Sequence, residues 1–547
     1  MRIKLFVLAG LIVCIVGCSR NSSSQSSPVI VTNHHIATTF TVPSNPYGLS
    51  TPEECNYAVF TRYYYNPEPP QIKAILVLMP GFFGGAADFD KMAKTIVQMG
   101  KGDIEVWAVD RRSVLLNDFT GMQEAWNKRK PSIAVDYYFN EAIVNGKTYA
   151  GTPTPTSMSY MSEWGLDMTL RDLNTIISLV PQQYRKTNVF LGGHSLGAFL
   201  SQGYAAYDFG TGPTDTTNAG YNSVAGVMLL DGGGSGMLQP VTETAYFSST
   251  GVTLTISGLE FILPSVNMLE TDPAQVTAAG LLPALIRTSF LNVFTFVQIE
   301  GMYAMLEPNK ESTLLQNLDF RSIAATLLGN TQFKATNQAM LGFSLDCNFN
   351  PISIMCATLG SVNGPVKSTA SFLDPNMTIS QPTDKGTMTY TWNSQNHITY
   401  MTDLAAALSN TYTTMTERYF PTRLLLDSLA MADYGPTQTT DWRFQNAGMR
   451  VIYTPQMDAP VIAFGGTSGA ERTEEVYHLY RDTVAPARNC SGQPRTACGF
   501  DIHIMPDYTH LDVLLSDPTL SSDNVDAMIY NWIMSNTGGD MPVPVLP

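Results

Sequence analysis

A serine between two glycines is the part of this 547-residue sequence best suited to chemistry. Ser195 stands at the centre of the run Gly193–Gly197, which reads Gly-His-Ser-Leu-Gly and fits the pattern G-x-S-x-G. An apolar stretch at 189–191 precedes this run, and the helix-forming residues 198–200 follow it. Between a strand and a helix, the turn is so tight that side chains at the two glycine positions would collide. The pattern therefore predicts a sharp turn that presents the Ser195 hydroxyl as a nucleophile.

A serine hydroxyl reacts at neutral pH only if a neighbouring base takes its proton. Histidine is the usual base, and the chain has seven. His510 follows the last predicted strand, 500–505, after a polar turn at 506–509. The other six lie near the N-terminus, in the serine turn, in a polar loop, in a predicted helix and in a predicted strand: His34, His35, His194, His397, His478 and His503. We predict that His510 is the base.

Two backbone N–H groups must stabilise the oxyanion that forms when the serine attacks a carbonyl group. One is expected from Leu196, the residue after the nucleophile, and the other from the loop after an early strand. Residues 72–79 form a continuous apolar run, typical of a buried parallel strand, and the loop 80–85 follows it. Glycine occupies three of the six loop positions, so the backbone can approach a substrate closely. We predict the N–H of Phe82 as the second donor.

A carboxylate must orient the histidine, and the sequence offers two candidates. Asp231 directly follows the apolar run 225–230. Glu471 comes later after the run 459–464, behind the glycine-rich stretch 465–470. A rigid strand end positions a carboxylate better than a glycine-rich loop does. Asp231 is therefore the favoured acid, and Glu471 stays as the alternative.

These features together resemble the α/β-hydrolase superfamily. The resemblance rests on the turn Gly193–Gly197, the loop Pro80-Gly81-Phe82 and the late run His510-Leu511-Asp512. It covers roughly residues 56–231 and 455–535, and it implies the chain order Ser…acid…His, with the base in the loop after the final strand.

The chain departs from the superfamily pattern at two positions. Pro80 stands where many relatives have a histidine, and the usual acid position after the penultimate strand is vacant. The superfamily includes esterases, lipases, peptidases, dehalogenases and members without catalysis, so the fold alone does not fix the reaction. A serine nucleophile argues against a dehalogenase, because dehalogenases attack with a carboxylate.

Strands that alternate with amphipathic helices predict a mainly parallel sheet covered by helices on both faces. The predicted elements are leading antiparallel strands at 28–42 and 57–65, strands at 72–79 and 104–109, and helices at 89–97, 166–180 and 525–533. The ligand of such a sheet binds at the carboxyl ends of the strands. Ser195, Asp231 and His510 are expected to meet there.

A long insertion divides the predicted core into residues 29–231 and 451–547. Residues 232–450 are far more than a strand connection needs and carry helical apolar patterns. We expect a mostly helical cap over the serine, inserted before the penultimate strand. Its most apolar parts are 281–286, 290–297, Met302, Met305 and Leu306. They either line a site for apolar groups or pack the core of the cap itself.

The N-terminus reads as an export signal. A basic start is followed by an apolar run that is shorter than the ~20 residues of a membrane span. Ile15-Val16-Gly17-Cys18 is similar to the bacterial lipobox, which implies a signal peptide at 1–17 and a lipid on Cys18. Residues 18–28 would form a flexible polar tether. The expected location is the bacterial cell envelope, at the outer membrane if the organism has one.

Composition excludes several function classes. The net charge of −15 argues against nucleic acid as a partner. No metal-ligand spacing, phosphate loop or dinucleotide fingerprint is found, so neither a cofactor nor a metal is expected. An exported protein can form disulfides, and among the cysteines after Cys18 the nearest in sequence are Cys347 with Cys356 and Cys490 with Cys498.

The sequence thus predicts a lipid-anchored serine hydrolase that cleaves esters of apolar acyl groups through an acyl-enzyme intermediate. Its partners would be a small apolar ester or lipid and, through the anchor, a membrane. Two alternatives stay open: a peptidase or amidase of the same fold, and a surface lipoprotein that binds a hydrophobic ligand without chemistry.

Overall fold

A computed structural model describes residues 28–210, 215–234, 240–256, 259–277, 284–317, 321, 331–371, 378–432, 440–520 and 524–547. The predicted signal peptide, the lipid site at Cys18, most of the tether and residues 281–283 of the insertion lie outside these ranges. Among the described helices, none combines the length and apolar character needed to cross a membrane.

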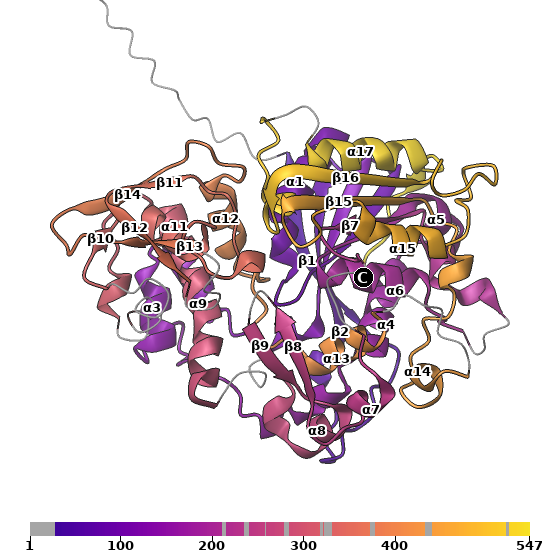
Figure 1. Ribbon diagram of the computed structural model, residues 1–547, viewed down its shortest axis with the longest axis horizontal. Coiled ribbons are helices and arrows are strands. Elements are labelled where there is room, and N and C mark those ends of the chain that lie inside the picture. The colour runs from indigo at the N-terminus through magenta and orange to yellow at the C-terminus, as the bar shows by residue number, and fades with distance from the viewer. Residues whose placement is uncertain are drawn as a thin grey trace, which may run out of the picture.

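An eight-stranded sheet forms the centre of the molecule, in the order β1-β2-β5-β4-β6-β7-β15-β16 (Figure 1). Its strands are β1 (Val29–Ala37), β2 (Tyr57–Tyr65), β4 (Ala74–Met79), β5 (Ile104–Asp110), β6 (Val189–His194), β7 (Gly226–Leu230), β15 (Val461–Ser468) and β16 (Phe500–Thr509). β2 runs antiparallel to both of its neighbours, and every pair from β5 to β16 is parallel. This is the mainly parallel sheet that the sequence predicted.

Both faces of the sheet are covered because its central strands are apolar on both sides. In β4, Ile75 and Val77 face one hydrophobic core while Leu76 and Leu78 face the other, as the period of two in a strand requires. The first core contains α4 (Leu166–Ile177) and α6 (Leu196–Ala205), and the second contains α1 (Asp90–Gly100) and α17 (Val525–Asn536). The remaining elements outside the insertion are β3 (Gln71–Ile72), α2 (Thr120–Asn127), α3 (Ser132–Phe139), α5 (Gln182–Asn188), α15 (Glu475–Thr483), α16 (Asp512–Leu515) and β17 (Met541–Pro542).

The last strand is longer than the sequence pattern indicated. β16 continues through 506–509, which the sequence assigned to a turn, and ends at Thr509. Its pairing with β15 shifts register between Gly466 and Ser468, and Asp507 has a φ of 63°. The irregularity lets the polar residues continue the strand, so His510 follows its end directly. At the other edge of the sheet, His34 and His35 belong to β1.

The secondary structure of the described part of the insertion between β7 and β15 is mostly helical, as the sequence predicted, and it also includes short strands. In chain order its elements are α7 (Glu243–Tyr246), β8 (Val252–Ile256), β9 (Leu259–Leu263), α8 (Val266–Thr271), α9 (Ala284–Leu306), β10 (Lys334–Ala335), α11 (Asn337–Leu345), β11 (Ser361–Asn363), β12 (Val366–Ala370), β13 (Thr378–Pro382), β14 (Thr389–Asn393), α12 (Met401–Leu408), α13 (Thr422–Ala430) and α14 (Trp442–Gln445). Elements α9 to α12 form a lobe beside the sheet, at the left of Figure 1.

The lobe has a hydrophobic core of its own, and part of it comes from outside the insertion. Met122 and Tyr137, from α2 and α3, pack in that core with Ile299 and Met302 of α9. The sequence had placed α2 and α3 with the first part of the sheet domain. Met302 thus packs the lobe itself, and Leu306 lies against the same core, while Met305 is exposed.

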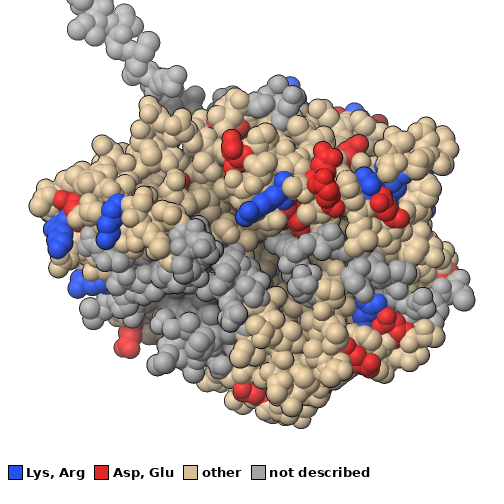
Figure 2. All heavy atoms as spheres, viewed as in Figure 1, with Lys and Arg blue, Asp and Glu red and all other residues tan. Residues whose placement is uncertain are grey.

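Two disulfides close short loops, Cys347–Cys356 in the insertion and Cys490–Cys498 before β16. Cys55 is a free, buried cysteine. On the face shown in Figure 2, the described Lys and Arg side chains are scattered among Asp and Glu, without a continuous basic surface.

Candidate active site

Ser195 occupies the turn between β6 and α6, at the carboxyl end of the sheet. Its backbone has φ 57° and ψ −122°, a conformation that costs free energy for a residue with a side chain. The Ser195 N–H donates to the carbonyl oxygen of Leu230 at 2.9 Å, which ties the turn to the end of β7. The residue is 5% exposed. The residue is therefore held in a strained conformation by the neighbouring strand.

The two glycines of the turn have no room for a side chain. A Cβ on Gly193 would lie 2.0 Å from the carbonyl oxygen of Gly197, and one on Gly197 would lie 2.0 Å from that of Met79. Both obstacles are backbone atoms, which cannot move aside as a flexible side chain would. The sequence pattern predicted that side chains at these two positions would collide, and these backbone atoms are what they would collide with.

We expect Gly193→Ala to lower the free energy of unfolding by at least about 3 kcal/mol, because the added methyl group collides with fixed backbone. Urea denaturation followed by tryptophan fluorescence measures the change. Gly203→Ala is the matched control on α6, since its Cβ would meet only Leu170, at 3.9 Å. This control should be neutral or stabilising by up to about 1 kcal/mol. Equal losses in both variants would contradict the steric explanation.

His510 and Asp231 form a buried pair beside this turn. His510 Nδ1 lies 2.5 Å from Asp231 Oδ2, and the two residues are 3% and 0% exposed. Asp231 also accepts hydrogen bonds from the N–H groups of Gly466, Ala470 and Glu471 at 2.8–3.2 Å. With Nδ1–H donating to this carboxylate, the lone pair of the imidazole is on Nε2. Nε2 is the atom that a base would use.

Glu471, the alternative acid, lies against Asp231 rather than in its place. Its carboxylate accepts a hydrogen bond from Gly234 N–H at 3.1 Å, and its own N–H donates to Asp231 at 2.9 Å. Burial, and secondly the charge of Asp231, raise the pKa of Glu471 to about 7. Because the imidazole bonds Asp231, the geometry favours Asp231 as its partner.

His194, which the sequence left without a role, supports His510. Its Nε2 lies 3.0 Å from the carbonyl oxygen of His510, and the two rings are 4.3 Å apart. Burial lowers the pKa of His194 well below its usual value, so the ring is neutral. A neutral ring next to a carbonyl oxygen must carry its proton on Nε2 and donate it. His194 thereby fixes the backbone of the residue after β16.

The loop after β4 packs directly on the serine turn. A Cβ on Gly81 would lie 2.8 Å from the Cβ of Ser195. Within the described residues, the N–H groups of Phe82 and Leu196 donate to no other backbone or side-chain atom. These are the two donors that the sequence predicted for an oxyanion.

Arg111, buried at the end of β5, holds this loop from behind. Its guanidinium donates to the carbonyl oxygens of Pro80, Gly81 and Gly84 at 2.7–3.0 Å. Its Nε donates to Glu417 at 2.6 Å. In a trans peptide the C=O and the N–H point in opposite directions, so fixing the Gly81 carbonyl directs the Phe82 N–H away from Arg111.

We expect Arg111→Lys to lower kcat on the order of 10- to 100-fold with a smaller change in KM, because one ammonium nitrogen cannot replace the three guanidinium nitrogens that bond the carbonyl oxygens and Glu417. Steady-state kinetics on an activated ester measure both constants. Arg112→Lys is the control, because Arg112 is also buried but bonds Asp172 instead of the loop. A kcat for Arg111→Lys equal to that of Arg112→Lys would rule out a role for Arg111 in positioning the loop.

Ser195 and His510 line the same cavity, of about 70 Å³. Core and insertion share its wall. The core contributes the loop of Phe82 and Phe83, and the insertion contributes mostly apolar side chains from α9, α11, α12 and the segments near them: Val297, Leu345, Ile354, Met355, Leu408, Met415 and Thr416. The insertion therefore covers the serine, as the sequence predicted for a cap.

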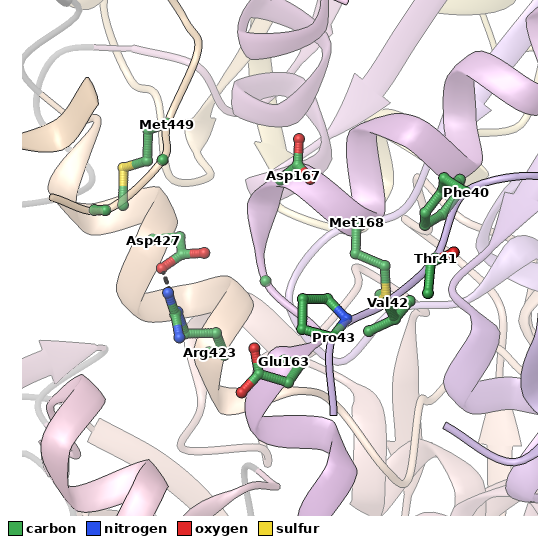
Figure 3. Close-up of a pocket in the computed structure, with 13 residues that line it drawn as sticks. Phe40, Thr41, Val42, Pro43, Glu163, Asp167, Met168, Arg423, Asp427 and Met449 are labelled. Atoms are coloured by element: carbon green, nitrogen blue, oxygen red, sulfur yellow. Dashed lines mark hydrogen bonds and ion pairs between the residues drawn. The ribbon is translucent and has the colours of Figure 1, made fainter. Parts of the chain in front are cut away.

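A second cavity, of about 230 Å³, lies between α4, α13 and the segment 40–43 (Figure 3). Ser195, Asp231 and His510 do not line this cavity. Two of its charged side chains bond each other, since Arg423 donates to Asp427 at 2.8 Å. Asp427 also accepts the N–H of Leu166 at 2.9 Å. These bonds connect α13 of the insertion to the first turn of α4, which is a structural role.

Comparison with known proteins finds similarity only at the level of three-dimensional structure. No family model matches the chain, and no curated protein matches its sequence. A Sulfolobus solfataricus protein provisionally described as a lipase aligns with a TM-score of 0.42 and 12% identity, over 93% of this chain and 95% of its own. The peroxisomal α/β-hydrolase Lpx1 of Saccharomyces cerevisiae aligns with a TM-score of 0.39 and 8% identity, over 95% of this chain and 92% of its own. An epoxide hydrolase from an endophytic Streptomyces aligns with a TM-score of 0.36 and 10% identity, over 93% of this chain and 97% of its own.

Proposed function

Because this chain has the α/β-hydrolase fold with a serine at its nucleophile turn, we propose that it is a serine hydrolase that cleaves carboxylic esters. The observation that carries the proposal is the buried His510–Asp231 pair at 2.5 Å, in which His510 lines the same cavity as Ser195. A protein that only binds a ligand needs neither an oriented base nor a strained serine turn.

The proposed reaction has two steps of the same kind. His510 Nε2 takes the proton of Ser195 Oγ as the hydroxyl attacks the ester carbonyl carbon, and Asp231 stabilises the imidazolium that forms. The N–H groups of Phe82 and Leu196 stabilise the oxyanion. The imidazolium then protonates the leaving alcohol, and an acyl-enzyme remains. Water, activated by the same imidazole, releases the acid and restores Ser195.

The cavity wall supports an ester with apolar groups. The rings of Phe82 and Phe83 lie 3.8 Å apart, and Phe83 also packs against Phe294 of α9 at 5.3 Å. These rings, with the Leu and Met side chains of the insertion, would bury a short hydrocarbon chain. A cavity of about 70 Å³ is smaller than the ~300 Å³ typical of sites for larger ligands, so longer chains require the cap to move.

Labelling with a fluorophosphonate tests the proposal, because an activated serine reacts irreversibly and an ordinary hydroxyl does not. The expected result is one adduct per chain, on Ser195, identified by peptide mass spectrometry. A panel of p-nitrophenyl esters and aminoacyl p-nitroanilides then separates an esterase from a peptidase. Absence of both labelling and ester hydrolysis in the folded protein would refute the proposal.

We also propose that the enzyme acts in the cell envelope, held by a lipid on Cys18. The support is the lipobox-like run before Cys18 in the sequence. An anchor would keep the enzyme near esters that gather at membranes, because several acyl chains bind a bilayer stably. If the Cys18→Ser variant stays in the membrane fraction to the same extent as the parent protein with Cys18, the anchor proposal fails.

A further inference from the structure

Two polar side chains in the wall of the Ser195 cavity have no part in the proposed reaction. They are Asp88, in the turn before α1, and Thr416, in the insertion. Both flank Gly84, in the loop 80–85 that follows β4. Gly84 forms an antiparallel bridge with Thr416, and Asp88 Oδ2 lies 2.0 Å from where a Gly84 Cβ would be. Because Gly84 has no side chain, the Asp88 carboxyl group lies directly against the loop.

Neither side chain has a hydrogen-bond partner within the described residues. Asp88 is 4% exposed, and its carboxyl group makes no side-chain hydrogen bond there. The Thr416 hydroxyl is buried and also makes none. Buried polar groups are nearly always paired, because an unpaired one loses its hydration without compensation. Two such groups on the wall of one cavity indicate that a ligand supplies the missing bonds.

The charge around Asp88 decides what kind of group that ligand offers. Burial raises the pKa of Asp88 well above its usual value; Asp110 and Glu417 raise it further, and Arg111 opposes them. The raised pKa favours the uncharged form of this carboxyl group. A neutral carboxyl group both donates and accepts hydrogen bonds, as a threonine hydroxyl does. In this form Asp88 and Thr416 together suit an uncharged hydroxyl group, which also donates and accepts.

We infer that Asp88 and Thr416 form a subsite for a hydroxyl group that the ester carries a few atoms from its scissile carbonyl. The inference rests on the proposed function and narrows it to hydroxylated esters. The small size of the cavity keeps the hydroxyl group close to the reacting carbonyl. The group belongs to the acyl part or to the alcohol part of the ester, and substrate pairs distinguish the two.

The first experiment compares kcat/KM of the full chain for two matched pairs. p-Nitrophenyl 3-hydroxybutanoate against p-nitrophenyl butanoate tests the acyl part. Glyceryl monobutanoate against propyl butanoate tests the alcohol part. We expect a preference of at least about 10-fold for the hydroxylated member of one pair, because an apolar analogue leaves the subsite unpaired. Hydrolysis without preference in either pair would overturn the inference, whereas no hydrolysis of any ester would overturn the proposed function.

The second experiment measures, in variants, the ratio of kcat/KM for the hydroxylated ester to kcat/KM for its matched ester without the hydroxyl group. Asp88→Leu and Thr416→Val should each bring it toward one, whereas Asp88→Asn should keep most of it, since an amide is also a neutral donor and acceptor. Glu300→Gln, a buried carboxyl group outside the cavity, and Thr369→Val, on β12, are controls that should keep the ratio. If Asp88→Leu does not fold in a thermal melt, Thr416→Val decides. A ratio kept in Thr416→Val, or lost equally in Asp88→Asn and Asp88→Leu, would contradict the subsite.

Discussion

Replacing Ser195 with alanine is expected to lower kcat for ester hydrolysis on the order of 10⁶-fold, which leaves a rate near the detection limit. The reason is that the reaction has no other nucleophile once the hydroxyl is gone, although the Phe82 and Leu196 donors remain. Stopped-assay kinetics with p-nitrophenyl butanoate measure the loss, and labelling by the fluorophosphonate should disappear with it.

Ser159→Ala provides the control for this loss. Ser159 is also buried, and its hydroxyl makes no hydrogen bond within the described residues, so its removal should cost neither stability nor turnover. Circular dichroism should show that both variants are folded. A folded Ser195→Ala variant with the parental rate would end the proposal of a serine mechanism.

Asp231→Asn is expected to lower kcat on the order of 10⁴-fold with little change in KM. An asparagine at 2.5 Å from His510 Nδ1 can hold the ring through its NH₂ group, which selects the tautomer with the proton on Nε2. That tautomer cannot take the proton of Ser195. The loss should appear equally in the rate of fluorophosphonate labelling, which reports activation of the serine rather than folding.

The Glu471→Gln variant tests whether Asp231 or Glu471 is the acid that orients His510. Because Glu471 bonds Gly234 N–H and not the imidazole, the glutamine variant should keep kcat within about 10-fold of the parent. A loss larger than that of Asp231→Asn would assign the acid role to Glu471 instead.

The same variant has an effect on stability that depends on pH. The pKa of Glu471 is raised in the folded chain, so the folded state binds its proton more tightly than the unfolded chain does. The parent therefore loses stability as the pH rises from about 4.5 to about 7, by on the order of 3 kcal/mol at most from this group. The pH profile of Glu471→Gln should lack this contribution.

Local patterns in the sequence were sufficient for the elements that present the site. The turn at Ser195 follows from two glycines whose need is steric and local, and the strand 74–79 follows from a continuous apolar run. The buried strands and amphipathic helices predicted a mainly parallel sheet, which the strand pairing confirmed. His510 was distinguished by its position after the last strand, although the strand itself extends to Thr509.

Other parts of the site had no local signal. Arg111 follows a buried strand, which could have marked it, but its partner Glu417 lies 306 residues away in the chain. The bridge that brings Thr416 to Gly84, next to Asp88, is equally remote, and the support of His510 by His194 spans 316 residues. Neither spacing nor residue type reports such contacts.

Sequence alone determined the turn at Ser195 and the buried central strands, because steric limits and hydrophobic periodicity act over a few neighbouring residues. Tertiary structure alone decided which carboxylate meets the imidazole, which arginine orients the loop and which polar groups the cavity leaves unpaired. Those outcomes depend on how strands and insertion pack across hundreds of residues, where distance in space is independent of distance along the chain.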